Sequence, residues 1–178
     1  MSSRVIALPQ VEGALVWGGP LMILYEDEQR RLEEICDRLL RDIQALAVFF
    51  IDPEGQLIAR VGRHDEDDTA ALSSLVAGTV AATTRLAQLL GQSDFPTHYH
   101  EGPREHLYIA KVTEGLILVV LFDERASLGL VRLRVRKTRL AVEVVYDSMV
   151  SKATRGRKFD PFVDITDEEV DRFFGDGF

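Results

Sequence analysis

Apolar positions recur with helical spacing between Glu26 and Ile43. They lie three or four residues apart, with charged residues between them: Leu32, Ile35, Cys36, Leu39, Leu40 and Ile43. This period is typical of an amphipathic helix with one buried face. Cys36 is the one cysteine of the chain and falls within the apolar stripe. We therefore expect it to be a packed thiol that forms no internal disulfide.

Two short apolar runs follow this helical pattern. Ala45–Ile51 is continuously apolar, and Leu57–Val61 resumes the pattern after a break. The break, from Asp52 to Gly55, contains proline and glycine, which favour tight turns because one presets φ and the other permits positive φ. The two runs therefore predict a β-hairpin.

A second helical pattern covers Thr69–Leu90. We expect Asp67 or Asp68 to cap its first turn, and Gly91 to end it. The positions expected to face the core are Leu72, Leu75, Val76, Thr79, Thr83, Leu86 and Leu90. The opposite face carries small residues where a solvated helix would carry lysine and glutamate. It contains Ser74, Gly78, Ala81, Arg85 and Gln88, with Ala77 beside them. So smooth a face favours close approach by another helix or protein.

Three more strands are predicted, at Thr97–Glu101, His106–Val112 and Leu116–Asp123. Pro96 restricts the first to a sheet edge or a strand start, and Glu114-Gly115 favours a hairpin between the other two. The last run is uniformly apolar, which predicts a central strand covered on both faces.

The segment Leu128–Met149 begins like a strand, with alternating apolar and basic residues. Over its full length the apolar residues keep a spacing of three and four, which favours a helix. We expect its basic residues to point in several directions and to pair with the acidic surface. They are Arg132, Arg134, Arg136, Lys137 and Arg139.

A basic linker, Ser151–Lys158, precedes an acidic tail. Thr166 and Glu169 form a capping box, which predicts a short helix carrying Val170, Phe173 and Phe174. The order of elements predicts an α/β sandwich, α-β-β-α-β-β-β-α, whose five-stranded antiparallel sheet has helices on both faces.

Charge and motifs narrow the function. A net charge of −8 disfavours nucleic acid as a partner. The apolar stretch Val5–Leu24 is interrupted by Pro9 and Pro20, so we expect neither a membrane span nor a signal peptide, and a cytoplasmic protein. The sequence has no phosphate loop, GxGxxG, HExxH or GxSxG motif, so we expect no cofactor and no catalytic site.

His98 and His100 lie two residues apart, with Glu101 and His106 nearby. Two histidines at this spacing lie on one face of a strand and bind a metal when a third ligand approaches. A metal-dependent enzyme is therefore an alternative hypothesis, and a plain polar strand face is the other interpretation.

Several segments resemble the roadblock/dynein-light-chain domain family and, within it, the bacterial MglB-type proteins. The resemblance runs from about Met22 to the C-terminus. Its most specific segments are Leu24–Glu28, Ile35–Leu39, Leu75–Ala82, Phe95–Gly102, Val119–Asp123, Ser127–Arg134 and Pro161–Ile165. It implies a roadblock domain at residues 22–153, an N-terminal extension at 1–21, and a linker with an acidic tail helix at 154–178.

The resemblance also implies a function. Members form homodimers with their sheets joined across the two-fold axis and their second helices side by side. They activate MglA, a Ras-like GTPase of cell polarity and motility, by remodelling its active site without an arginine finger. The resemblance places the GTPase contact on Ser74, Ala77, Gly78, Ala81, Ala82 and Arg85, and a tail contact, which influences nucleotide exchange, on Phe162, Ile165, Val170, Phe173 and Phe174.

Two features depart from the family. Residues 1–21 have no recognised counterpart, and Arg85 stands where members have a small residue. A peripheral ion pair, altered docking and an arginine finger are all open roles for Arg85. An adaptor that binds a GTPase or another protein without activating hydrolysis is the alternative function.

Overall fold

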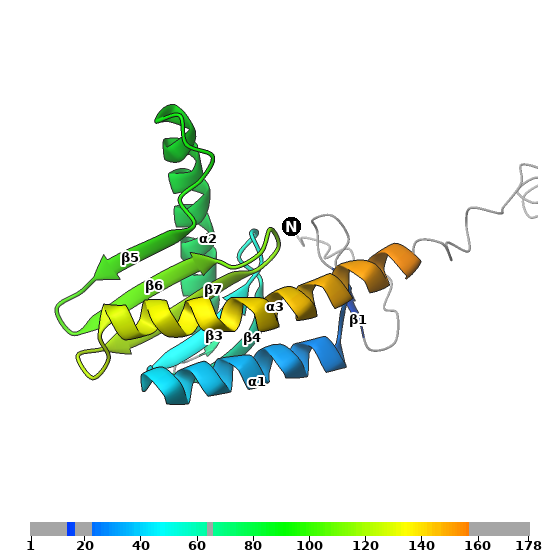
Figure 1. Cartoon of the computed structure of the whole chain (residues 1–178), viewed down its shortest axis with the longest axis horizontal. Helices are drawn as coiled ribbons and strands as arrows, with labels where there is room; N and C mark the ends of the chain where they lie inside the picture. Colours follow the sequence, from blue (N-terminus) through cyan, green and yellow to red (C-terminus); the bar gives the residue numbers. More distant parts are fainter. Residues whose placement is uncertain (1–13, 17–22, 64–65, 157–178) are drawn as a thin grey trace, which may run out of the picture.

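Five antiparallel strands form the central sheet, in the order β4-β3-β7-β6-β5 (Figure 1). The structure is a computed structural model that describes residues 14–16, 23–63 and 66–156. Its elements, in chain order, are β1 (Ala14–Val16), β2 (Ile23–Tyr25), α1 (Glu26–Ile43), β3 (Ala47–Ile51), β4 (Leu57–Gly62), α2 (Glu66–Leu89), β5 (Thr97–Glu101), β6 (Glu105–Lys111), β7 (Ile117–Asp123) and α3 (Leu128–Gly156). This confirms the predicted order of helices and of the five sheet strands.

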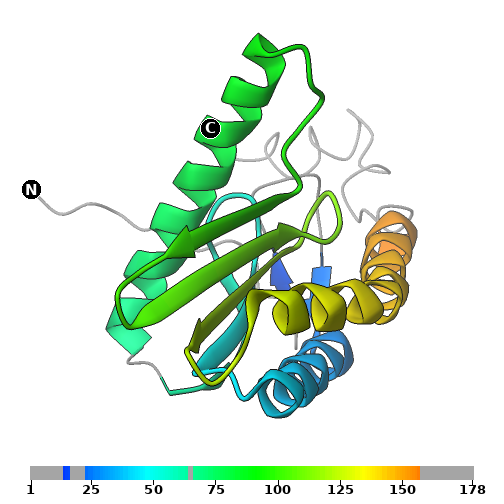
Figure 2. The same cartoon turned by 60° about the vertical axis from the view of Figure 1, so that its left-hand side comes forward.

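The helices cover both faces of the sheet, as the sequence predicts. Figures 1 and 2 show α1 and α3 side by side on one face and α2 on the other. The two central strands, β3 and β7, face a core on each side because neighbouring side chains alternate between faces. Phe50 and Leu118 belong to the core beneath α1 and α3, whereas Phe49 and Val119 belong to the core beneath α2.

Helix α1 has the predicted bounds and the predicted buried face. Leu32, Cys36 and Leu39 are buried against the sheet and α3. The helix ends at Gln44, whose left-handed backbone (φ 58°) lets its N–H bond to carbonyl oxygens of the last turn. Burial raises the pKa of the Cys36 thiol far above its usual range, so this cysteine is an inert core residue.

Helix α3 is longer than the apolar pattern predicts. It continues to Gly156, so the first part of the expected linker is helical. Contacts with the start of α1 support this extension. Lys152 Nζ lies 2.5 Å from the buried carboxylate of Glu28 and 3.0 Å from the exposed carboxylate of Asp27. Ser148 donates a hydrogen bond of 2.9 Å to Glu28.

A second, two-stranded sheet was not predicted. Ala14–Val16 pairs with Ile23–Tyr25 in antiparallel register, directly before α1. Part of the expected N-terminal extension therefore pairs with the start of the domain. Three-residue strands contain too few alternations to give a period in the sequence, which explains the omission.

Candidate protein-interaction surface

Helix α2 lies across one face of the sheet, and its C-terminal end extends beyond the strands (Figures 1 and 2). It begins at Glu66, so Asp67 and Asp68 lie in its first turn instead of capping it. The other end follows the prediction, since Gly91 has a left-handed backbone (φ 72°) and Gln92 donates a hydrogen bond to the Ala87 carbonyl.

The side of α2 that faces the sheet is built from small residues. Its buried positions are Thr69, Ser73, Val76, Ala77, Val80 and Ala87. The turn between β3 and β4 approaches this side so closely that a Cβ atom at Gly55 would lie 2.9 Å from Ser74 Cα and 3.2 Å from Ala77 Cβ. Ala77 was expected on the exposed face, yet only 6% of it is accessible. Its small size is explained by the contact with this turn.

Replacing Gly55 with alanine is therefore expected to lower the free energy of unfolding by about 2–3 kcal/mol. About 1 kcal/mol comes from the left-handed backbone at φ 86° and the rest from the clash with α2. Gly91→Ala is the matched control, because Gly91 also has positive φ but an added Cβ meets no described atom within 4 Å. Urea denaturation of both variants separates the two contributions. Equal losses would mean that the turn does not constrain α2.

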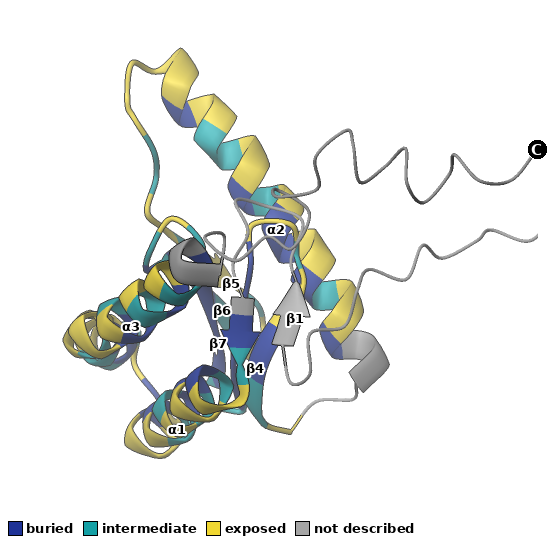
Figure 3. Ribbon diagram, turned by 90° about the vertical axis from the view of Figure 1, so that its right-hand side faces the viewer, coloured by how far each residue is buried: buried dark blue, intermediate teal, exposed yellow. Residues whose placement is uncertain are grey.

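The exposed side of α2 carries a leucine seam. Its residues follow the three-four spacing of a coiled-coil contact: Leu75, Thr79, Ala82, Leu86 and Leu89. Leu72, one turn earlier, is half-buried and packs against the core beneath α2, as predicted. Leu75 is 70% exposed, Leu86 49% and Leu89 76%. The prediction that Leu75, Leu86 and Leu90 face the core is therefore wrong. Leu86 and Leu90 lie toward the C-terminal end of α2, which extends beyond the strands and is largely exposed (Figure 3), whereas Leu75 lies on the side of its turn that points away from the sheet.

A small-residue strip lies beside the leucine seam. It consists of Ser74, Gly78, Ala81 and Arg85, all exposed. Among the described residues, a Cβ atom added at Gly78 would meet nothing within 4 Å, so packing within that part of the chain does not require glycine there. Glycine costs a helix about 1 kcal/mol relative to alanine. Arg85 donates a hydrogen bond of 3.0 Å to Gln88 and otherwise faces solvent.

The composition of α2 is unusual for an exposed helix. Within the described residues, Thr69–Leu89 is the one helix long and apolar enough to cross a membrane by length and composition, and 28% of this stretch is buried. Val76 and Val80 pack it against the sheet. We interpret the remaining apolar surface as a contact for protein, consistent with the seam and the strip that it carries.

The C-terminal end of α2 is fastened to the sheet edge through Asp94. This carboxylate accepts a hydrogen bond of 2.8 Å from the Thr84 hydroxyl and forms an ion pair with Lys111. Partial burial raises the pKa of Asp94, but Lys111 and the hydrogen bonds from Thr84 and the Phe95 N–H outweigh it and lower the pKa overall. The helix end is thereby held in place although no strand lies beneath it.

The structure does not assemble the hypothetical metal site. His98 lies 3.3 Å from the Thr83 hydroxyl, and burial lowers its pKa. His106 packs instead against the rings of Tyr99 and Phe122, which belong with the core beneath α3. The described part of the chain contains no group of three or more His, Cys, Asp or Glu residues able to hold a metal ion.

The predicted tail contact, at Phe162, Ile165, Val170, Phe173 and Phe174, lies outside the described residues, as does the predicted tail helix. Of the two predicted contacts, only the one on α2 lies within the described residues. Sequence reasoning found the small-residue strip of α2 but missed the leucine seam. The heptad spacing of the seam residues is visible in the sequence and could have indicated it.

Comparison with known proteins gives the family. The Roadblock/LC7 domain family matches residues 31–122. Among solved structures, MglB from Myxococcus xanthus is 43% identical (TM-score 0.67), covering 72% of this chain and 96% of that one. The gliding protein MglB from Thermus thermophilus is 32% identical (TM-score 0.66), covering 71% and 96%.

A third similar structure, at 31% identity and a TM-score of 0.67, is described as MglB with a tetrameric arrangement; it covers 72% of this chain and 96% of its own. No curated protein sequence matches the chain significantly. The α2 surface described above thus belongs to a fold shared along almost the full length of the MglB structures. The chain is a member of the Roadblock/LC7 domain family, of the MglB type.

Proposed function

We propose that this protein is a cytoplasmic activator of a bacterial Ras-like GTPase of the MglA type, in cell polarity or motility. The observation that carries the proposal is the exposed apolar surface of α2 in a chain with an MglB-type fold. The roadblock family to which the fold belongs regulates GTPases. The close approach of a partner's backbone explains a glycine at position 78, because an added Cβ there would meet no described atom within 4 Å.

The active form is a homodimer in this proposal. The leucine seam of α2 meets the same seam of a second copy, since a closed two-fold pair is the commonest oligomer and buries identical surfaces. Within the described part of the chain, the edge strand β5 pairs with β6 on one side only, which leaves its other side for the second sheet. The described tetrameric arrangement of a related MglB is consistent with self-association in this family.

The small-residue strips of the two copies would then form the GTPase contact, at Ser74, Gly78, Ala81 and Arg85, together with Ala82 from the adjoining seam. Ala77 is left out because it is buried. Hydrolysis requires a positioned water and neutralised charge on the transferred phosphoryl group. Docking on the strip would hold the GTPase's own catalytic residues in that arrangement, so this chain needs no catalytic site. In this proposal the C-terminal tail makes a second contact with the GTPase, which aids nucleotide exchange.

GTP turnover by the cognate GTPase tests the proposal. We expect at least a hundredfold acceleration at saturating dimer, approaching the range of about 10³–10⁵ known for GTPase activation. Complex formation with unchanged turnover would instead establish the alternative, a roadblock adaptor that holds the GTPase.

The same assay decides the role of Arg85. We expect Arg85→Ala to weaken binding more than it lowers the rate at saturation, whereas an arginine finger requires a loss of about 10³-fold at saturation.

A further inference from the structure

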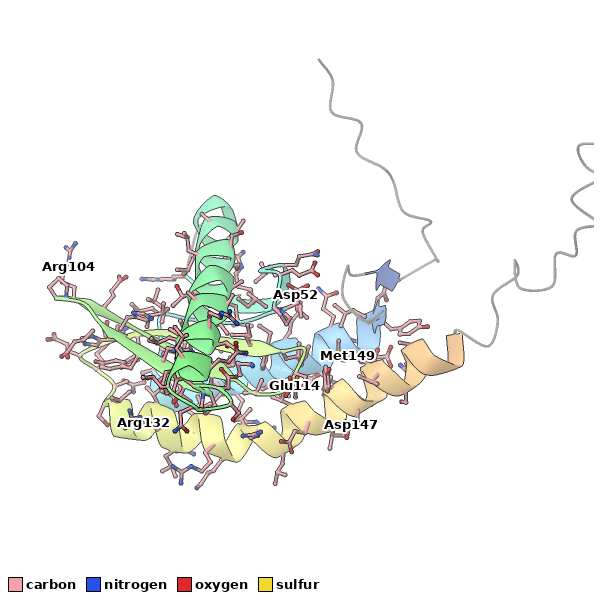
Figure 4. The ribbon with its side chains drawn as sticks, turned by 90° about the horizontal axis from the view of Figure 1, so that it is seen from above. Asp52, Arg104, Glu114, Arg132, Asp147 and Met149 are labelled. Carbon is pink, nitrogen blue, oxygen red and sulfur yellow. The ribbon has the colours of Figure 1, made fainter. Side chains whose placement is uncertain are left out.

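A basic groove lies between α3 and the outer strands, on the face of the sheet opposite α2. It encloses about 380 Å³, with Thr97, Tyr108 and Ala110 on the strand side. Its helical wall contains Arg132, Arg136 and Arg139, at positions i, i+4 and i+7 of α3. Figure 4 shows Arg132 near the start of the helix. These three arginines therefore share one side of α3, whereas the sequence predicted that the basic residues would point apart.

The groove holds positive charge that the described chain does not neutralise. Arg139 pairs with Glu143 at 2.9 Å, and Arg134, outside the groove, pairs with Asp42 at 3.4 Å. Among the described residues, neither Arg132 nor Arg136 forms an ion pair. The chain as a whole carries a net charge of −8, so unpaired cations beside an apolar floor point to an acidic ligand with apolar side chains.

The chain contains such a ligand. The tail from Asp160 to Asp171 has six carboxylates and no basic residue. Between the carboxylates stand Phe162, Val163, Ile165 and Val170. Arginine is well suited to such a partner because its planar guanidinium group binds carboxylates with two hydrogen bonds and packs against rings.

The tail is also long enough to reach the groove. From Arg136 to Gly156 the helix covers about 30 Å, at about 1.5 Å per residue. An extended chain covers about 35 Å from Gly156 to Asp167, at about 3.3 Å per residue. We infer that the groove of Arg132, Arg136 and Arg139 binds the acidic tail of the same chain. The tail then has two sites, and docking in the groove withholds it from a partner at α2.

A nitroxide on the tail of the full-length chain tests this inference. Thr166→Cys provides the attachment site, and buried Cys36 does not compete for the label. In NMR spectra we expect selective broadening of the Thr97 and Ala110 amide signals, while those of Gly78 and Ala81 on α2 stay sharp. High salt is expected to weaken the effect because exposed charges are screened.

Charge reversal in the groove supplies the decisive comparison. Arg132→Glu with Arg136→Glu is expected to abolish the broadening. Arg30→Glu with Arg38→Glu, the same change at exposed positions of α1, is expected to leave it intact. Equal loss in both variants, or loss on dilution into unlabelled chain, would overturn docking within one chain. The experiment contains no GTPase, so its outcome is independent of the proposed function.

Discussion

Replacing Ala81 with arginine is expected to lower the stimulated GTP turnover at least a hundredfold without changing the thermal stability. Ala81 lies on the small-residue strip and is exposed, so the fold has room for a longer side chain. In the proposed complex the same side chain is forced into a close contact and is buried without a partner. An unpaired buried charge costs about 3–5 kcal/mol, which is a factor of 10² or more in affinity.

The measurement is GTP turnover against protein concentration, with sedimentation to check that the variant remains a dimer. Ala141→Arg is the matched control, since Ala141 is an exposed alanine of α3, away from α2. We expect this control to activate fully. Full activation by the Ala81→Arg protein as well would show that the GTPase docks elsewhere.

The layers of the fold could be predicted from the sequence because the apolar residues of their helices and strands follow clear patterns. The uninterrupted apolar runs of β3 and β7 indicate strands covered on both faces, and the structure buries both. The stripe of α1 from Leu32 to Ile43 gives its bounds and its buried side. In these elements the period and the tertiary contacts agree, so single-sequence reasoning succeeds.

Helix α2 shows where that reasoning fails. Its leucines follow a helical period, and a period alone indicates that a face is covered without saying by what. The sequence predicts Leu75 and Leu86 in the core, and both are exposed. Near Leu75 the core beneath α2 is reached by smaller residues such as Ser73 and Ala77, because the Gly55 turn leaves little space. Predicting this would require the distance between the turn and the helix, which depends on contacts far apart in the sequence.

The groove beside α3 shows that the direction of charged side chains is equally hard to predict from the sequence. Arg132, Arg136 and Arg139 are interleaved with other basic residues, so their shared direction is hidden in the composition. It follows from the helical phase that Val131 and Val135 set when they pack on the sheet. Sequence reasoning about a charged cluster therefore needs the buried positions of the same helix first.

Replacing Leu86 and Leu89 together with glutamate is expected to raise the dissociation constant of the homodimer at least a thousandfold. Each leucine contributes about 1.5 kcal/mol or more when buried, and a two-fold contact contains both residues from each copy. Sedimentation velocity over a range of concentrations measures the change, and circular dichroism checks that the fold persists. The matched control is Leu140→Glu with Val144→Glu, because these residues are 74% and 65% exposed on α3. If the control dissociates the dimer as strongly, or the seam variant remains dimeric, the leucine seam is not the contact between copies. If the seam variant is a monomer that no longer stimulates hydrolysis, dimerisation through α2 is what builds the GTPase surface.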